Sequence, residues 1–321
     1  MIKIIFMGGG DFASPTLELL LKMNICKVVA IYSNDIKDGG VGGKKNRIPD
    51  IARENGINMI NIKKFDVASS FEFASFDADL AIVVSYGIIL PKEIINMPKY
   101  GCVNLHPSRL PSWRGASPIQ HTIINQDALT AVMLIKMTES LDAGDIVDAY
   151  YRPLEGGETY SDLIKYFAFA GAELVEGFLK SVANNENYNL LHLALPQIGR
   201  ATYASKIDKN QALINWSDSA DKIIAKIKGL SGFEAAFFKY KSQEVKVFNA
   251  EVVEDFDLER DRLNHQKFCG IGGLVASKKM HIYSGDGKLI LPLVLQRVGK
   301  KMLPVKEFLL GFALTPGDFV E

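Results

Sequence analysis

The chain has 321 residues, of which 48% are hydrophobic and 23% are charged, and its formal net charge is zero. This composition is typical of folded globular proteins and excludes disordered, collagen-like and coiled-coil chains. The length favours two domains over one, and a neutral chain offers no general electrostatic reason to bind nucleic acid.

Cysteine usage and hydropathy indicate a cytoplasmic protein. Cys26, Cys102 and Cys269 lack CxxC spacing, which disfavours a disulfide framework and a thiolate metal site. The histidines are too far apart in the sequence for a paired ligand motif, so we expect no bound metal. The first residues lack the features of a signal peptide, and no apolar run approaches the length of a membrane span. We therefore expect no association with a membrane.

The first half of the chain alternates β-branched runs with amphipathic stretches. This pattern predicts strands near residues 3–8, 27–34, 58–62, 80–87 and 102–106, with helices near 14–23 and 48–56. Further along, it predicts a helix near 117–126, an edge pair of strands at 130–137 and 145–154, and a long helix over 160–184. We predict an α/β fold with a doubly wound, Rossmann-like parallel sheet, which would bind its ligand at the carboxyl ends of its strands.

The second half has a different pattern. A stretch without a sustained period separates the two halves, and we predict a first domain over residues 1–189, a linker over 190–205 and a second domain over 206–321. In the second domain a helical pattern at 214–230 precedes short strands at 234–240, 244–253, 270–276 and 279–296, with Gly and Asp-Gly turns between them. These features predict a smaller β-barrel or sandwich.

A glycine-rich turn follows the first predicted strand. Gly8, Gly10 and Ala13 fit the G-x-G-x-x-[GA] fingerprint of dinucleotide-binding proteins. The acidic residue expected about 20 positions further on has only an approximate candidate in Asp35. Close packing of a helix on a strand requires small residues at the same positions. A nicotinamide-dependent oxidoreductase is therefore one alternative.

Two polar side chains interrupt the apolar strand at 102–106. Asn104 and His106 are two residues apart and so point to the same face of a strand, and Pro107 ends the strand directly after them. Buried amide and imidazole groups are costly without partners. Either loop backbone satisfies them, or they face a ligand cleft.

A second polar cluster follows a later strand, where Asp142 and Asp145 flank Gly144. A plain hairpin turn is one explanation. If the strand belongs to the same sheet, Asp142 could approach His106. A carboxylate, an imidazole and an amide together suit acyl transfer to an amine brought by the substrate. Neither Ser108 nor Cys102 stands in a nucleophile elbow.

These motifs resemble the folate-dependent formyltransferases. The family signature is Asn-x-His with a following Ser-Leu-Leu-Pro-like loop and a later Leu-Asp-x-Gly-Asp, which stand here as "NLHPSRLP" and "SLDAGDIV". "SYGIILP" (85–91) resembles the folate-pocket segment of the family. The resemblance spans nearly the whole chain and is most specific over residues 85–146.

Within this family the chain is most similar to the members that formylate initiator methionyl-tRNA. The segments that carry this likeness are "GGGDFASPTL", "WRGASPI", "INWSDSA", "EVKVF" and "VGKKM". The resemblance implies 10-formyltetrahydrofolate as the formyl donor and the α-amino group of methionyl initiator tRNA as the acceptor. A family member acting on an amino-sugar nucleotide is the nearest alternative, and a non-catalytic RNA-binding protein is another. We expect a monomer.

The resemblance also implies roles for individual residues. Asn104, His106 and Asp142 would be catalytic: the amine attacks the formyl carbon, Asn104 and His106 stabilise the oxyanion, and Asp142 supports His106 and the proton transfers. Folate contacts are expected from Gly87, Ile88, Ile89, Ser108, Arg109, Leu110 and Pro111. At position 109 the family usually has leucine, so the arginine is a departure from its pattern.

The resemblance further implies that an oligonucleotide-binding (OB)-like C-terminal barrel holds the tRNA. Candidate phosphate contacts are Lys44, Lys45, Arg47, Lys206, Lys209, Lys300 and Lys301. Gly42 stands where relatives tend to have an arginine, and a solvated basic loop is the alternative interpretation of residues 44–47. Residues 206–321 have a small excess of Lys and Arg over Asp and Glu, which permits tRNA binding but does not require it.

Overall fold

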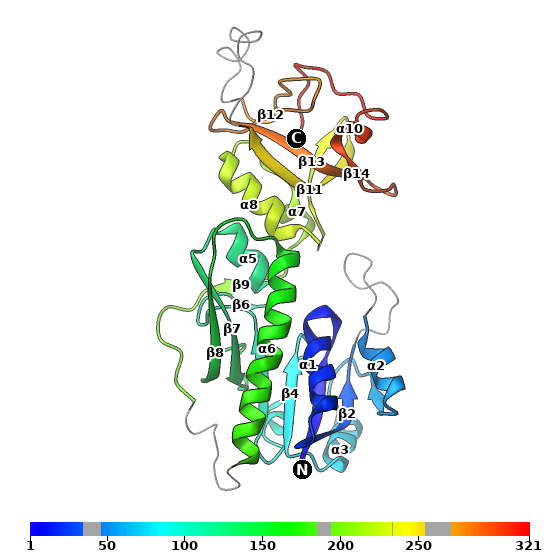
Figure 1. Cartoon of the computed structure of the whole chain (residues 1–321), viewed down its shortest axis with the longest axis vertical. Coiled ribbons are helices and arrows are strands. Elements are labelled where there is room, and N and C mark those ends of the chain that lie inside the picture. The colour runs from blue at the N-terminus through cyan, green and yellow to red at the C-terminus, as the bar shows by residue number, and fades with distance from the viewer. Residues whose placement is uncertain (35–45, 185–193, 233, 254–270) are drawn as a thin grey trace. The chain divides into compact units, whose positions relative to one another are not determined.

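The computed structural model describes residues 1–34, 46–184, 194–232, 234–253 and 271–321 (Figure 1). Contacts between residues divide the chain into two compact units. The first comprises Met1–Ile119, Ala128–Leu154 and Asp162–Lys206, and the second comprises Gln120–Asp127, Glu155–Ser161 and Ile207–Glu321. No helix in the described ranges is long and apolar enough to cross a membrane.

The first unit is built on a seven-stranded sheet with the order β3-β2-β1-β4-β5-β7-β8. Its strands are β1 (Ile2–Gly8), β2 (Cys26–Tyr32), β3 (Met59–Ile60), β4 (Leu80–Val84), β5 (Cys102–His106), β7 (Leu129–Lys136) and β8 (Ile146–Pro153). The Rossmann-like parallel arrangement is confirmed from β3 to β5.

The sheet is nevertheless mixed, because the two strands predicted as an edge pair join it through antiparallel pairing. β7 pairs antiparallel with both β5 and β8. The connection between β7 and β8 is shorter than the dozen or more residues that a parallel crossover needs. A short connection of this kind forces a hairpin, and the turn within it carries Asp142.

Helices cover both faces of this sheet. Those of the first unit are α1 (Gly10–Lys22), α2 (Ile48–Glu54), α3 (Val67–Ser75), α4 (Lys92–Ile95) and α6 (Tyr160–Ala183), while α5 (Pro118–Ile124) begins in the first unit and ends in the second. Figure 1 shows α1 and α6 in front of the sheet, and Gly171 of α6 lies against Leu105 of β5. Phe73 of α3 and Ile94 of α4 pack with residues of the sheet in another buried cluster. The two short helices α3 and α4 were not predicted from the sequence.

The second unit contains a separate, curled antiparallel sheet with the order β10-β11-β13-β12, and β14 pairs with β13. Its strands are β10 (Ala236–Tyr240), β11 (Gln243–Val253), β12 (Ile282–Tyr283), β13 (Leu289–Arg297) and β14 (Leu303–Pro304). Its helices include α7 (Lys209–Ala212), α8 (Ala220–Leu230) and α10 (Val305–Phe308). The pairing of β11 with β13 is irregular around Asn249, and such bulges bend a strand.

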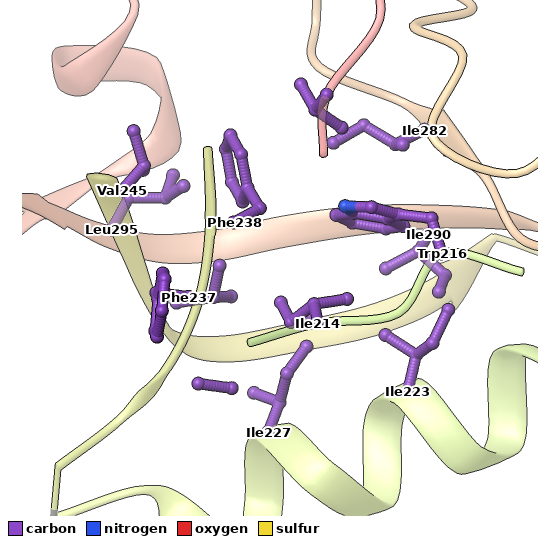
Figure 2. Packing of buried hydrophobic residues seen from close by; sticks show 14 of the residues in the cluster. Ile214, Trp216, Ile223, Ile227, Phe237, Phe238, Val245, Ile282, Ile290 and Leu295 are labelled. Carbon is purple, nitrogen blue, oxygen red and sulfur yellow. The ribbon is translucent and has the colours of Figure 1, made fainter. Parts of the chain in front are cut away.

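Helix α8 packs its apolar face on this sheet. Figure 2 shows Ile223 and Ile227 of α8 pointing toward Ile214, Trp216 and the strands. The rings of Trp216 and Phe238 meet edge to face, with 5.9 Å between their centroids. Burial of these side chains stabilises the unit by about 1.5–3 kcal/mol for each large one.

One strand predicted in this unit was wrong. Residues 271–276, which fell within a predicted strand, form isolated bridges, Leu274 with Phe319 and Val275 with Ile282. Gly273 has a φ of +86°, which is incompatible with a regular strand. A side chain at Gly272 would collide with the carbonyl oxygen of Trp216, 2.1 Å from the position of its Cβ. Gly272 is therefore needed because its backbone packs directly against the backbone of Trp216.

Candidate active site

Strand β5 presents Asn104 and His106 on one face. Val103 and Leu105 alternate with them, and Leu105 lies against Gly171 of α6 on the opposite face. The neighbouring strands β4 and β7 pair with β5 along its length. His106 is the last residue of β5, at the edge of the sheet where the parallel strands end.

The turn after β7 brings Asp142 to this edge. Gly144 lies against the backbone of Lys136, where an added Cβ would be 1.6 Å from the carbonyl oxygen. Asp142 has a φ of +47°, a left-handed conformation that is unusual for a residue other than glycine. A residue held in this region generally depends on the surrounding structure to keep it there.

The three predicted catalytic side chains converge. The Nδ1 atom of His106 lies 3.6 Å from the Oδ2 atom of Asp142. The Nδ2 atom of Asn104 lies 3.5 Å from Oδ1 of the same carboxylate, a long and weak contact. The backbone N–H of Gly115 donates to Oδ2 at 2.8 Å. The carboxylate is thus fixed by a backbone donor and faces both other side chains.

The second ring nitrogen of His106 also has a partner. Its Nε2 lies 3.0 Å from the carbonyl oxygen of Trp113, and because a carbonyl oxygen can only accept, Nε2 carries the proton. In the neutral ring Nδ1 is then unprotonated and faces Asp142. A proton taken up by this pair would lie between Nδ1 and Oδ2. Trp113 itself has a φ of +63°, a strained conformation for a large side chain.

Burial controls the charge of His106, whose exposed fraction is 4%. Burial lowers the pKa of the imidazole, and the positive charge of Arg114 acts in the same direction, whereas the Asp142 carboxylate and the Trp113 carbonyl act to raise it. A lowered pKa favours the neutral ring, in which the Nε2–H group is the hydrogen-bond donor.

Backbone groups of residues 113–116 complete the site, and no side-chain pattern in the sequence indicated them. The two-residue strand β6 (Arg114–Gly115) pairs with β9 (Tyr203–Ala204). Trp113 N–H donates to the Thr202 hydroxyl at 2.9 Å. A Cβ at Gly115 would lie 2.7 Å from the carbonyl oxygen of Ala204. The loop that contacts His106 and Asp142 is therefore held by residues 202–204.

Comparisons with known proteins assign the chain to a family. The formyl transferase family matches residues 2–176, and the C-terminal domain of formyl transferases matches residues 206–313. Methionyl-tRNA formyltransferase from Rhodopseudomonas palustris is 36% identical over 98% of this chain and 98% of its own length. The chain belongs to the methionyl-tRNA formyltransferase family. The member of this family from Orientia tsutsugamushi is 35% identical over the full length of both proteins.

Solved structures share the fold of this formyltransferase chain at lower sequence identity. The N-formyltransferase from Helicobacter canadensis, in complex with folinic acid and dTDP-3-aminofucose, has a TM-score of 0.64 and 19% identity, covering 92% of this chain and all of its own. Methionyl-tRNA formyltransferase from Clostridium thermocellum has a TM-score of 0.54 and 19% identity, covering 80% of this chain and 96% of its own. At this level of sequence identity the likeness shows the shared fold alone.

The residues predicted to contact folate in this formyltransferase chain have different surroundings. Gly87, Ile89 and Arg109 are exposed, and Ile88 is half-buried. Ser108 is fully buried and donates to the carbonyl of Ser112. Leu110 packs in a buried cluster of the sheet, and Pro111 is also buried. The exposed residues remain predicted ligand contacts, whereas Ser108 and Leu110 have packing roles of their own.

The candidate tRNA contacts are distributed over both units. Lys44 and Lys45 lie outside the described residues, as does Gly42. Arg47 is exposed but forms an ion pair with Glu18 at 2.8 Å. Exposed lysines complete the set: Lys206 in the first unit and Lys209, Lys300 and Lys301 in the second. Lys209 is paired with Glu244 at 2.6 Å.

The glycine turn after β1 has a structural explanation in this formyltransferase chain. A Cβ at Gly8 would lie 2.5 Å from the carbonyl oxygen of Val84 and 3.1 Å from the Cβ of Ala13. Close packing of β1, β4 and α1 therefore requires the small residues that resemble a dinucleotide fingerprint. Asp35, the approximate acidic partner of that fingerprint, lies outside the described residues.

Catalysis by a cysteine nucleophile or by a bound metal has little support in the described part of the chain. The thiol of Cys102 is buried, and burial raises its pKa to about 12, so it is a poor nucleophile. Among the residues that the structure describes, no group of three His, Cys, Asp or Glu side chains is placed to hold a metal ion.

Proposed function

We propose that this chain transfers the formyl group of 10-formyltetrahydrofolate to the α-amino group of methionyl initiator tRNA. The observation that carries the proposal is the convergence of Asn104, His106 and Asp142 at the end of β5 in a chain related over its full length to methionyl-tRNA formyltransferases. The acceptor follows from that relationship, and the chemistry follows from the side chains.

In the proposed reaction the amine nitrogen attacks the formyl carbon, and the electrons of the carbonyl bond move to its oxygen. Asn104 and the Nε2–H group of His106 are the donors available to this oxyanion. Collapse of the intermediate breaks the bond from the formyl carbon to N10 of the folate. The amine loses a proton and N10 gains one, so the products are formylmethionyl-tRNA and tetrahydrofolate.

The Trp113 carbonyl oxygen is relevant to how His106 engages its substrate. In the structure this oxygen accepts the Nε2–H hydrogen bond at 3.0 Å. A formyl oxyanion is an acceptor of the same kind and more strongly charged. We infer that the oxyanion replaces the Trp113 carbonyl at Nε2 as the amine attacks the formyl carbon.

Asp142 has a separate part in this proposal. Its carboxylate faces the unprotonated Nδ1 atom of His106 and is held by the N–H of Gly115. A proton released by the attacking amine can be held by the His106–Asp142 pair and then returned to the leaving nitrogen. No covalent intermediate on the protein is required.

The second unit is proposed to be an OB-like tRNA-binding domain. Its curled, five-stranded antiparallel sheet with a packed helix is compatible with that architecture. Exposed lysines such as Lys300 and Lys301 would neutralise phosphates, and affinity would then fall steeply with salt. An enzyme that acts on charged tRNA is expected to work in the cytoplasm.

Parallel assays test the acceptor. With 10-formyltetrahydrofolate as donor, we expect formyl transfer to charged initiator tRNA and none to an amino-sugar nucleotide. Activity on the sugar nucleotide alone would overturn the proposed acceptor while leaving formyl transfer intact. Binding of NADH, with no binding of a folate analogue, would overturn both the proposed acceptor and formyl transfer itself. Light scattering should give the monomer mass of 35.4 kDa.

A further inference from the structure

Gln197 makes four hydrogen bonds beside the proposed catalytic residues. Its amide nitrogen, Nε2, donates to the carbonyl oxygens of Asp142 and Gly144, both at 2.8 Å. Its amide oxygen accepts from Nη2 and Nε of Arg114, at 2.7 and 3.2 Å. An amide has two N–H donors and two acceptor lone pairs, so all four are used. The opposite orientation of the amide would place oxygen against two carbonyls and nitrogen against a cation.

The two segments that Gln197 joins each supply a partner to the proposed catalytic pair. On one side, Asp142 has a left-handed backbone, which needs outside support to persist. On the other side, Arg114 stands between Trp113, whose carbonyl contacts His106, and Gly115, whose N–H contacts Asp142. Gln197 therefore fixes the carboxylate and the groups around it relative to one another.

We infer that Gln197 is a positioning residue for formyl transfer, which holds the Asp142–Gly144 turn and Arg114 so that the Asp142 carboxylate faces the His106 imidazole. The inference rests on the proposed catalytic roles of His106 and Asp142. Gln197 touches neither the imidazole nor the carboxylate, and it acts through the backbone of the turn and through the guanidinium.

Two substitutions remove the bridge with little change in volume. Gln197→Met abolishes all four hydrogen bonds. Gln197→Glu keeps acceptors for Arg114 but loses both donors and places a carboxylate against two carbonyls. We expect kcat to fall about tenfold to a hundredfold in both variants, because small displacements of reacting groups cost this much. The KM values for the folate and for the tRNA should change less than about twofold, since Gln197 makes no bond that a substrate would replace.

The pH dependence of kcat provides a readout that a purely structural role would not affect. The charge of Arg114 lowers the pKa of His106, and the Asp142 carboxylate acts to raise it. In both variants the Asp142–Gly144 turn loses its two hydrogen bonds from Gln197, so the Asp142 carboxylate is no longer held facing the imidazole and its effect on the pKa of His106, which is larger than that of Arg114, is weakened. The limb of the kcat profile that reports His106 should therefore move to lower pH.

Ile198→Ala is the matched control, since this neighbouring side chain is 87% exposed. Its kcat and pH profile should equal those of the wild-type chain. All variants are assayed at temperatures where circular dichroism shows them folded. Wild-type kcat and an unshifted profile in Gln197→Met or Gln197→Glu would overturn the inference. If instead Asp142→Asn were fully active, the proposed site itself would fail, whatever the Gln197 variants did.

Discussion

The Asp142 carboxylate lies 3.6 Å from the His106 imidazole, although one residue follows β7 and the other ends β5. The antiparallel pairing of these two strands puts His106 opposite Met133 and leaves the turn after β7 free to fold back. The contact between His106 and Asp142 thus depends on the antiparallel pairing of β7 with β5, which brings the turn after β7 close to the end of β5.

Removing either member of the pair should reduce turnover strongly. We expect His106→Ala and Asp142→Asn to lower kcat by about 10² to 10⁴, the usual effect of losing an oxyanion donor or a proton-transfer partner. Single-turnover formylation of charged initiator tRNA measures the effect. Asp145→Asn is the matched control, because this carboxylate is in the same turn but is exposed. Equal losses in all three variants would contradict the assignment.

Gly144→Ala should damage the turn that carries Asp142. The new Cβ would lie 1.6 Å from the Lys136 carbonyl oxygen, so the backbone must move. We expect a loss of about 1–3 kcal/mol in the free energy of unfolding together with lower kcat. Denaturant titration measures the free energy of unfolding. Gly177→Ala in α6 meets no atom within 4 Å and should stabilise the chain by up to about 1 kcal/mol; the same loss at both positions would refute the steric explanation.

Acidification should destabilise the chain through His106. Burial lowers the pKa of its imidazole below the ordinary value of 6.5, so the unfolded state binds a proton that the folded state does not. The contribution of this group is complete above pH 6.5 and is lost as the pH falls toward the lower pKa of the folded state. His106→Gln should therefore flatten the dependence of unfolding free energy on pH in that window.

His281 provides an independent check of the same effect in the second unit. Burial also lowers the pKa of His281, with the charge of Lys279 acting in the same direction. His281→Gln alone should also flatten the pH dependence of the free energy of unfolding. The variant that combines His106→Gln and His281→Gln should flatten it further. An unchanged slope after the loss of both imidazoles would mean that other groups control acid stability.

Lys300 and Lys301 test the proposed tRNA surface. Replacing both with alanine should weaken tRNA binding and reduce the steepness of its salt dependence by about one unit for each lysine that touches a phosphate. Fluorescence titration at several salt concentrations measures both. Lys306→Ala removes an exposed lysine of α10 that lies outside the proposed set. If Lys306→Ala weakens tRNA binding as much for each charge removed, the tRNA is attracted by the overall positive charge and not by a surface at Lys300 and Lys301.

The sequence predicted the parts of the site that depend on local pattern. Asn104 and His106 could be placed on one face because a strand alternates its side chains, and Asp142 because a turn follows an apolar strand. The Trp113 carbonyl and the Gly115 N–H could not be predicted, since backbone groups leave no mark in residue identity. Gln197 stands in a stretch without periodicity, and its contacts depend on how that stretch returns to the sheet.

The pairing of β6 with β9 determines how short a working catalytic fragment can be. The match to the formyl transferase family ends at residue 176, before β9 begins at Tyr203. A fragment truncated there would keep Asn104, His106 and Asp142 yet lack the chain that braces the loop against them. Such a fragment should be inert, and the minimal active one must extend to about residue 206, where the first unit ends.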